Sequence, residues 1–226
     1  KSFRKSFDQF YGNISEYCIL SLLPNYRERE GSSLIYMVDD LIKNSQHPKS
    51  GFYLNNYKGL SSTLEELEKK GQKTILIGVS YALLDLSDQF PQRLEHTIII
   101  ETGGTKGERK ELIKEELHKI LKNAFSLNKI HSEYGMTELL SQSYSKGDNI
   151  FKSPPWKKIL IRDVNDPLTV IGNDKTGGIN IIDLANIYSC PFIATQDLGK
   201  TFDDGSFSVL GRFDNSDVRG CNLLIQ

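Results

Sequence analysis

The chain has 226 residues, of which 38% are hydrophobic and 25% are charged, as is typical of a soluble globular protein at the upper size range for one domain. Its 28 Lys and Arg residues balance 29 Asp and Glu residues, which gives a net charge of −1. This balance excludes long-range attraction to nucleic acid or to an anionic membrane, so any acidic substrate must be bound by local contacts.

Alternating strand and helix patterns run through the first two thirds of the chain. Strands are predicted at residues 18–23, 74–79 and 97–100, and helices at 33–44, 61–70, 81–90 and 108–124. Beyond Trp156 the pattern becomes β-rich, with strands at 159–164, 178–182 and 192–194 and a final hairpin. We therefore expect an α/β fold with a mainly parallel sheet flanked by helices, followed by a smaller β-rich C-terminal subdomain.

The boundary between these two parts is predicted at the segment Ser153-Pro154-Pro155. Proline biases the residue before it away from helix, and two prolines in a row stiffen the connection. We accordingly divide the chain into residues 1–152 and 153–226.

The cysteines and the apolar stretches indicate the cellular compartment. Cys18, Cys190 and Cys221 form no Cys-x-x-Cys pair and show no zinc-ligand spacing, so we expect reduced thiols. No apolar stretch near the N-terminus approaches the roughly 20 residues of a membrane-spanning helix. We expect a cytoplasmic protein without a membrane span.

Residues 133–138, with the sequence Glu-Tyr-Gly-Met-Thr-Glu, form the most informative segment and are predicted to lie in a loop at the end of a strand. Tyr134 offers a ring for stacking on a purine, and Gly135 lets a backbone approach closely. Thr137 offers a donor to a phosphate oxygen, and Glu138 a hard oxygen ligand for Mg2+. An equally compatible interpretation is a polar turn in which Thr137 caps a following helix.

Two later segments favour the nucleotide interpretation. Asp197 lies in Ala-Thr-Gln-Asp-Leu-Gly at 194–199, and Arg212 lies in Gly-Arg-Phe-Asp at 211–214. The intervening residues 203–210 combine a turn with alternating apolar residues, which predicts a β-hairpin. Such a hairpin would bring Asp197 and Arg212 together.

In this order the three segments resemble those of the adenylate-forming superfamily, which includes acyl-CoA synthetases, peptide-synthetase adenylation domains and luciferases. The resemblance implies an enzyme that uses ATP and Mg2+. It implies that Tyr134 stacks on adenine, that Thr137 contacts the α-phosphate and that Glu138 binds Mg2+. It further implies that Asp197 and Arg212 hold the ribose hydroxyls.

A glycine-rich loop at residues 101–107 follows an apolar run and precedes a predicted helix. Its spacing differs from that of a Walker phosphate loop, although such a loop can present backbone amides to an anion. The resemblance places Gly103, Gly104 and Thr105 on the adenine side of the site. The alternative is a plain turn between strand and helix.

A narrower resemblance is to the acyl-protein synthetase family, typified by the synthetase subunit of the bacterial luminescence fatty-acid reductase. It rests on residues 22–26, 31–34, 101–107, 154–156 and 219–224. It implies that a carboxylic acid substrate, a fatty acid in that family, is activated as acyl-AMP and then passed to a cysteine near the C-terminus. Cys221 has that position. The resemblance also implies a partner protein that accepts the acyl group or reduces it. The alternative for Cys221 is a small packed hydrophobe.

Two departures from the superfamily pattern limit this interpretation. No Ser/Thr/Gly-rich phosphate loop occurs between Lys1 and Ser61, and the sequence stops at Gln226 without a C-terminal lid domain. We expect a fragment of an adenylate-forming large domain that binds nucleotide weakly and is itself inactive. Two alternatives stay open: a CoA ligase resembling phenylacetate-CoA ligase, and a non-catalytic nucleotide-binding or interaction module.

Overall fold

The computed structural model describes residues 1–23, 32–103 and 112–213 of the chain. These residues form one twelve-stranded sheet in the order β2-β1-β3-β4-β5-β6-β7-β12-β11-β10-β8-β9. The strands are β1 (Cys18–Leu22), β2 (Gly51–Phe52), β3 (Thr74–Val79), β4 (Thr97–Thr102), β5 (His131–Tyr134), β6 (Ser143–Ser145), β7 (Phe151–Lys152), β8 (Lys157–Arg162), β9 (Val170–Ile171), β10 (Gly177–Asp183), β11 (Phe192–Thr201) and β12 (Phe207–Arg212). The helices are α1 (Ser2–Tyr11), α2 (Ser33–Ser45), α3 (Tyr57–Lys69), α4 (Ser80–Gln89) and α5 (Lys114–Phe125), with short 3-10 turns η1 (Ile14–Glu16) and η2 (Leu184–Asn186).

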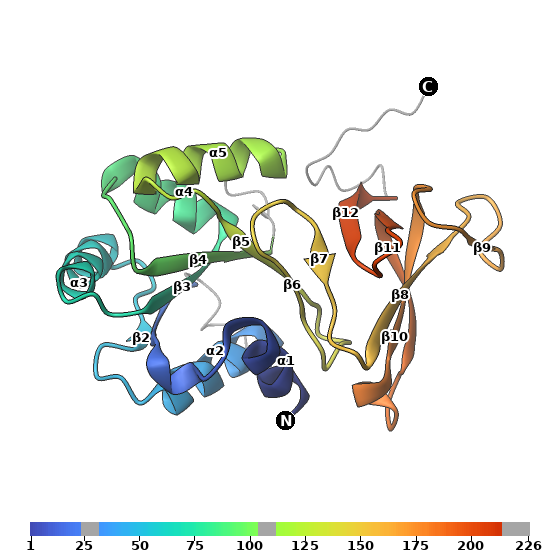
Figure 1. The fold of residues 1–226 in the computed structure, drawn as a ribbon, viewed down its shortest axis with the longest axis horizontal. Coiled ribbons are helices and arrows are strands. Elements are labelled where there is room, and N and C mark those ends of the chain that lie inside the picture. Colours follow the sequence, from blue (N-terminus) through green and yellow to red (C-terminus); the bar gives the residue numbers. More distant parts are fainter. Residues whose placement is uncertain (24–31, 104–111, 214–226) are drawn as a thin grey trace.

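The first five strands of the sheet are parallel, and every later pairing is antiparallel. Strands β1 and β3 are runs of apolar residues buried on both faces, as parallel strands covered by helices require. In Figure 1, α4 and α5 lie on one side of these strands, and α1 and α2 lie on the other. The predicted fold class is confirmed: a helix-flanked sheet is followed by a β-rich second part.

Two hydrophobic clusters form the core of the described residues. The larger cluster joins β1, β3 and β4 to the helices, and the smaller one lies among β7, β8, β10 and β12 in the right half of Figure 1. Although the cores are separate, the hydrogen-bonded sheet runs continuously through both parts. The division at residue 153 stays a prediction.

Most predicted elements are present, with shifted ends. Helix α3 begins at Tyr57 rather than at residue 61, because the side chain of Asn56 accepts a hydrogen bond from the backbone of Gly59 and caps the helix earlier. Among the described residues α5 begins at Lys114, whereas the prediction began at 108. Strand β11 extends to Thr201 and therefore carries Asp197 within the sheet.

The helix-cap interpretation of Thr137 is wrong, because no helix follows this residue. The amide of Leu139 bonds back to the carbonyl of Met136 at 3.1 Å, and the chain then returns as the antiparallel strand β6.

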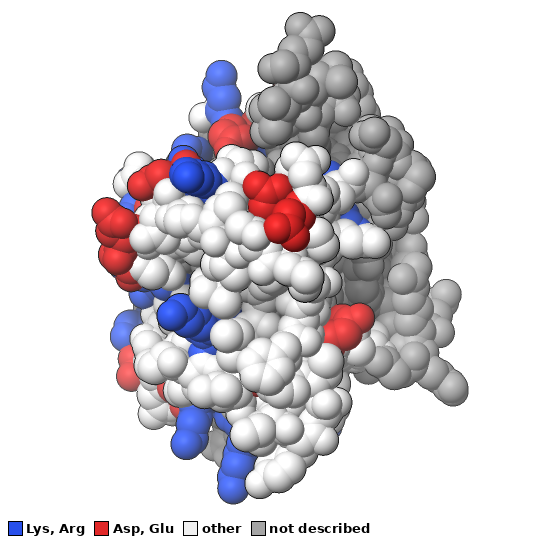
Figure 2. Space-filling view, turned by 90° about the vertical axis from the view of Figure 1, so that its right-hand side faces the viewer, with Lys and Arg blue, Asp and Glu red and all other residues white. Residues whose placement is uncertain are grey.

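None of the described helices is long and apolar enough to cross a membrane. On the face shown in Figure 2, basic and acidic side chains are interspersed rather than gathered by sign.

Candidate functional site

Tyr134, the last residue of β5, is joined directly to Asp197 of β11. Its phenol hydroxyl donates a 2.7 Å hydrogen bond to the Asp197 carboxylate. Burial and the nearby Asp197 charge raise the pKa of the phenol well above its ordinary value, so Tyr134 remains a donor. The ring packs edge-on against Phe151 and Phe207 at centroid distances of 6.0 and 5.6 Å. The hydrogen bond of its hydroxyl group and the contacts with the two phenylalanine rings therefore hold the Tyr134 ring in place.

The predicted hairpin is present, and it places Asp197 directly opposite Arg212. The two residues are register partners in the antiparallel pair of β11 and β12. The Arg212 Nε lies 3.9 Å from an Asp197 oxygen, and the guanidinium donates a 2.8 Å hydrogen bond to the side chain of Gln196. A cation and a carboxylate thus stand side by side at the sheet surface, next to the Tyr134 hydroxyl.

Gly199 explains why the Asp-Leu-Gly segment contains a glycine. The pairing of β11 with β12 is irregular between Leu198 and Gly199. A Cβ atom at Gly199 would lie 2.4 Å from the carbonyl oxygen of Ser208 and 2.7 Å from the side chain of Ile179. Because Gly199 has no side chain, the two strands can approach closely, and Asp197 comes to lie opposite Arg212.

Thr137 and Glu138 lie in the turn between β5 and β6, and both are exposed. The Thr137 hydroxyl is 3.2 Å from the Ser33 hydroxyl at the start of α2. The Glu138 carboxylate makes no hydrogen bond or ion pair within the part of the chain that the structure describes. No described residue therefore occupies its oxygens.

Gly135 lies between the Tyr134 ring and this turn. A Cβ atom there would fall 2.3 Å from the Glu133 carboxylate and 3.3 Å from the side chain of Gln142. Glu133 accepts a 2.5 Å hydrogen bond from the Thr102 hydroxyl, and burial raises its pKa against the effect of that bond. The amide oxygen of Gln142 is buried and has no hydrogen-bond partner. The absence of a side chain at Gly135 thus leaves room for the Glu133 carboxylate beneath the site.

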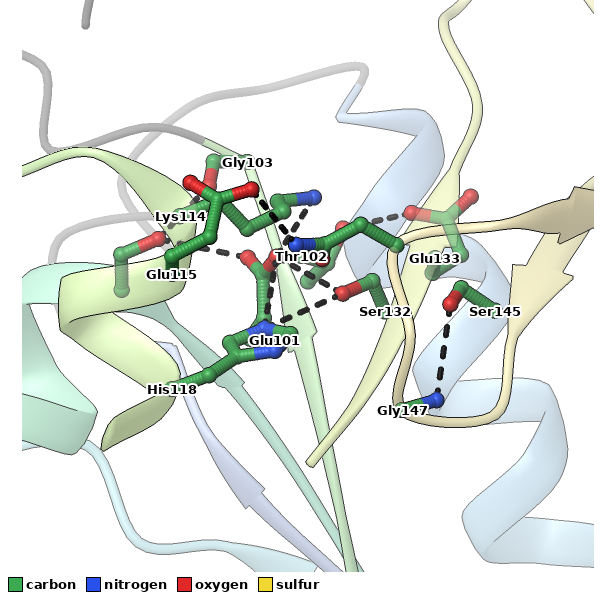
Figure 3. Close-up of polar contacts among 12 residues, drawn as sticks. Glu101, Thr102, Gly103, Lys114, Glu115, His118, Ser132, Glu133, Ser145 and Gly147 are labelled. Atoms are coloured by element: carbon green, nitrogen blue, oxygen red, sulfur yellow. Dashed lines mark hydrogen bonds and ion pairs between the residues drawn. The ribbon is translucent and has the colours of Figure 1, made fainter. Parts of the chain in front are cut away.

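A buried ionic network fixes the carboxyl end of β4 next to Gly103 (Figure 3). Glu101 is only 2% exposed; its carboxylate lies 2.7 Å from Lys114 Nζ and 3.7 Å from His118 Nε2, and accepts a 3.0 Å hydrogen bond from Ser132. Burial alone would raise the pKa of Glu101, but Lys114 and His118 lower it to about 2. The network joins β4, α5 and β5.

Sequence reasoning missed this network. Ser80 extends it, because its hydroxyl donates to Glu101 at 3.3 Å and to the carbonyl of Gly103 at 2.8 Å. A signal existed in the sequence: Glu101 directly follows the apolar run 97–100, so a carboxylate had to end a buried strand. A charge in such a place needs partners.

The predicted site residues fall into three groups. Tyr134, Asp197 and Arg212 are brought together, and Gly135, Thr137 and Glu138 follow Tyr134 directly in the chain. Gly103 ends the described part of the β4 segment, one strand away from Tyr134. Gly104, Thr105 and Cys221 lie outside the described residues. Within the described residues no group of three or more His, Cys, Asp or Glu side chains is placed to hold a metal ion.

Comparison with known proteins identifies the fold. No protein-family model and no curated protein matches the sequence. Solved structures do match: ATP-bound MatB from Rhodopseudomonas palustris has a TM-score of 0.67 and 14% identity over 92% of this chain and 42% of its own. O-succinylbenzoate coenzyme A synthetase (MenE) from Bacillus subtilis, in complex with ATP and magnesium ion, has a TM-score of 0.59 and 19% identity over 94% and 46%.

A third match is the amide bond synthetase McbA from Marinactinospora thermotolerans, with a TM-score of 0.60 and 13% identity over 92% of this chain and 43% of its own. The chain shares their fold. It spans less than half the length of each of these three structures. At such low identity the likeness establishes architecture, and activity has to be argued from the site.

Proposed function

We propose that this chain forms part of the nucleotide site of an ATP-dependent ligase that activates a carboxylic acid as acyl-AMP. The observation that carries the proposal is the assembly of Tyr134, Asp197 and Arg212, which come from motifs far apart in the sequence. Two of the three solved structures reported above hold ATP, which supports the assignment of the nucleotide.

The proposed reaction is an in-line displacement at the α-phosphorus. A carboxylate oxygen of the substrate attacks that phosphorus, the bond to the bridging oxygen breaks, and pyrophosphate leaves. In this proposal Asp197 accepts hydrogen bonds from the ribose hydroxyls and Arg212 donates to them, while Tyr134 lies against the adenine. Gly103 lies on the adenine side in this proposal; Gly104 and Thr105, assigned there by the resemblance, are outside the described residues. Fixing the nucleoside places the α-phosphate for attack.

Thr137 and Glu138 suit the phosphates. The exposed Thr137 hydroxyl can donate to an α-phosphate oxygen, and the Glu138 carboxylate, which has no partner among the described residues, is the group that would hold Mg2+. One carboxylate with phosphate and water oxygens is an ordinary ligand set for this ion. When bound, Mg2+ neutralises negative charge on the phosphates. Gly135 lets the backbone approach the nucleotide closely.

The finer assignment is an acyl-protein synthetase acting on a fatty acid. A thiolate, that of Cys221 in this proposal, attacks the acyl carbonyl; a thioester forms and AMP leaves. The thioester would then serve a reductase or another acyl-accepting partner protein. The alternative acceptor is coenzyme A, which is favoured by one observation: a solved structure with this fold is a coenzyme A synthetase.

The proposal is tested by incubating the full-length protein that contains this chain with Mg-ATP and a panel of fatty and aromatic acids, with and without coenzyme A. Acid-dependent release of AMP and pyrophosphate is expected. An acyl adduct in the intact mass that disappears in Cys221→Ser identifies the protein thiol as acceptor, whereas acyl-CoA without an adduct identifies a CoA ligase. ATP binding without AMP formation from any acid would leave a non-catalytic nucleotide-binding module.

A further inference from the structure

The turn that carries Thr137 and Glu138 has no regular secondary structure, yet its backbone is fixed by side chains from the β-rich part of the chain. Asp183, at the end of β10, is fully buried. One of its oxygens accepts a 2.9 Å hydrogen bond from the amide of Leu140, and the other accepts a 2.8 Å bond from the hydroxyl of Ser141. A single buried carboxylate thus holds two consecutive residues of the turn.

Asn186 forms a hydrogen bond with the backbone of Glu138 itself. Its side-chain amide donates a 2.8 Å hydrogen bond to the carbonyl oxygen of Glu138 and a 3.1 Å bond to the carbonyl of Cys190. Asn186 is 7% exposed and lies in η2, whose first turn is capped by Asp183 through a 3.1 Å bond from Ala185. The two side chains therefore form one unit beneath the turn.

Trp156, which precedes β8, and Lys157, the first residue of β8, complete the support. The indole of Trp156 donates to the Ser141 hydroxyl at 2.8 Å, and the Lys157 ammonium donates to the Ser141 carbonyl at 3.0 Å. Lys157 is 4% exposed and also lies 5.3 Å from the centroid of the Tyr134 ring, on its face. Burial lowers the pKa of Lys157 to about 8 despite the nearby charges of Glu133 and Asp183.

The support fixes the backbone of the turn and makes no hydrogen bond to the side chains of Thr137 and Glu138. Asp183 and Asn186 bond to main-chain groups and to Ser141. Thr137 and Glu138 are exposed, and the Thr137 hydroxyl lies 3.2 Å from that of Ser33. Ordering a loop costs conformational entropy. A turn that is already ordered spares a ligand that cost, and a ligand group held by its neighbours binds a metal more tightly.

We propose that Asp183 and Asn186 are positioning residues that hold the turn from residue 137 to 141 so that Thr137 and Glu138 meet the metal-bound phosphates of ATP. This inference rests on the proposed function. It assigns to the β-rich part a role in the metal-dependent portion of nucleotide binding, separate from the ribose contacts of Asp197 and Arg212.

The test is the affinity for ATP with and without Mg2+, measured by calorimetry on the wild type, Asn186→Ala and Asp183→Asn. In the wild type we expect Mg2+ to strengthen ATP binding. In Asn186→Ala we expect Mg-ATP to bind about tenfold more weakly, with little change in the affinity for ATP in EDTA. A merely structural role would weaken both affinities alike.

Matched controls are Asn173→Ala, which removes a hydrogen-bonding side chain, and Asp166→Asn, which neutralises a hydrogen-bonded carboxylate; both positions lie in exposed loops of the same β-rich part. Both are expected to keep the wild-type response to Mg2+. If Asp183→Asn does not fold, as thermal unfolding will show, Asn186→Ala decides the question.

Folded variants that keep the full Mg2+ response, in a wild type that shows one, overturn the inference and leave the proposed function intact. A wild type that does not bind ATP, or that binds it without any Mg2+ effect, overturns both.

Discussion

The hydroxyl of Tyr134 donates a 2.7 Å hydrogen bond to the carboxylate of Asp197, 63 positions further along the chain. Two motifs that are separate in the sequence are therefore joined side chain to side chain. Arg212 faces the same carboxylate from the neighbouring strand, so Asp197 has a partner on either side.

Replacing Tyr134 by Phe tests the contribution of this bond to stability. The variant keeps the ring and its contacts with Phe151 and Phe207 but loses the donor to a charged acceptor, so we expect a loss of about 1 to 2 kcal/mol in the free energy of unfolding. Tyr36→Phe, at a position where the tyrosine is 72% exposed, should leave stability unchanged. Equal urea midpoints for Tyr134→Phe and the wild type would show that the bond contributes nothing.

Replacing Glu101 by Gln should destabilise the protein because Lys114 loses the carboxylate that it faces in a buried site. We expect a loss of about 2 to 3 kcal/mol at neutral pH. The matched control is Glu65→Gln, which breaks the exposed ion pair with Lys69 and should leave the unfolding midpoint near that of the wild type.

The pH dependence of this effect has a definite sign. The pKa of Glu101 is about 2 in the folded chain against 4.5 without these interactions, so the charged form is favoured by folding. The stabilisation is present above about pH 4.5 and is lost as the pH falls towards 2. Unfolding measured across this window should show the difference between wild type and Glu101→Gln shrinking. A constant difference would contradict the network.

Lys157 should make the protein more stable as the pH rises from about 8 to about 10. Its pKa of about 8 in the folded chain lies below the 10.5 of an exposed lysine, so the unfolded chain binds more protons in this window. Methionine has no titratable group, so relative to Lys157→Met the free energy of unfolding of the wild type should rise by about 2 kcal/mol over this window. Parallel stability curves for the two proteins between pH 8 and pH 10 would show that Lys157 is not buried as described.

Replacing Gly199 by Ala should disturb the hairpin that carries Asp197. The added methyl group would meet the Ser208 carbonyl oxygen, and backbone atoms must move to relieve the contact. We expect a loss of about 1 to 3 kcal/mol in the free energy of unfolding. Gly51→Ala is the control, since its Cβ position is open and stability should change by less than about 0.5 kcal/mol. Similar midpoints for both variants would contradict the close strand approach.

Much of the fold could be predicted because the first strands have a strong pattern. The run 74–79 is apolar after Thr74 and is found as β3 with the predicted ends. The pairing of Asp197 with Arg212 was also accessible, because a turn between alternating segments fixes which residues face each other. The helix at 61–70 began too late because the cap came from Asn56, a residue outside the apolar pattern.

The support beneath the turn could not be predicted in the same way. Asp183 and Asn186 act on backbone groups more than 40 residues away in the sequence, and no local pattern encodes such contacts. Lys157 did leave a signal: Ile159 and Ile161 face the core in alternation, and the same period places Lys157, but not Lys158, on the inner face.

The measurement that tests the central claim most directly is calorimetric titration of Mg-ATP into the wild type and into Asp197→Ala, with Asp166→Ala as a control in an exposed loop. The account predicts saturable binding to the wild type and to the control, and binding at least about tenfold weaker in Asp197→Ala at unchanged fold, because the ribose hydroxyls lose their charged acceptor. Equal affinities for the wild type and Asp197→Ala, or no saturable binding to the wild type, would contradict it.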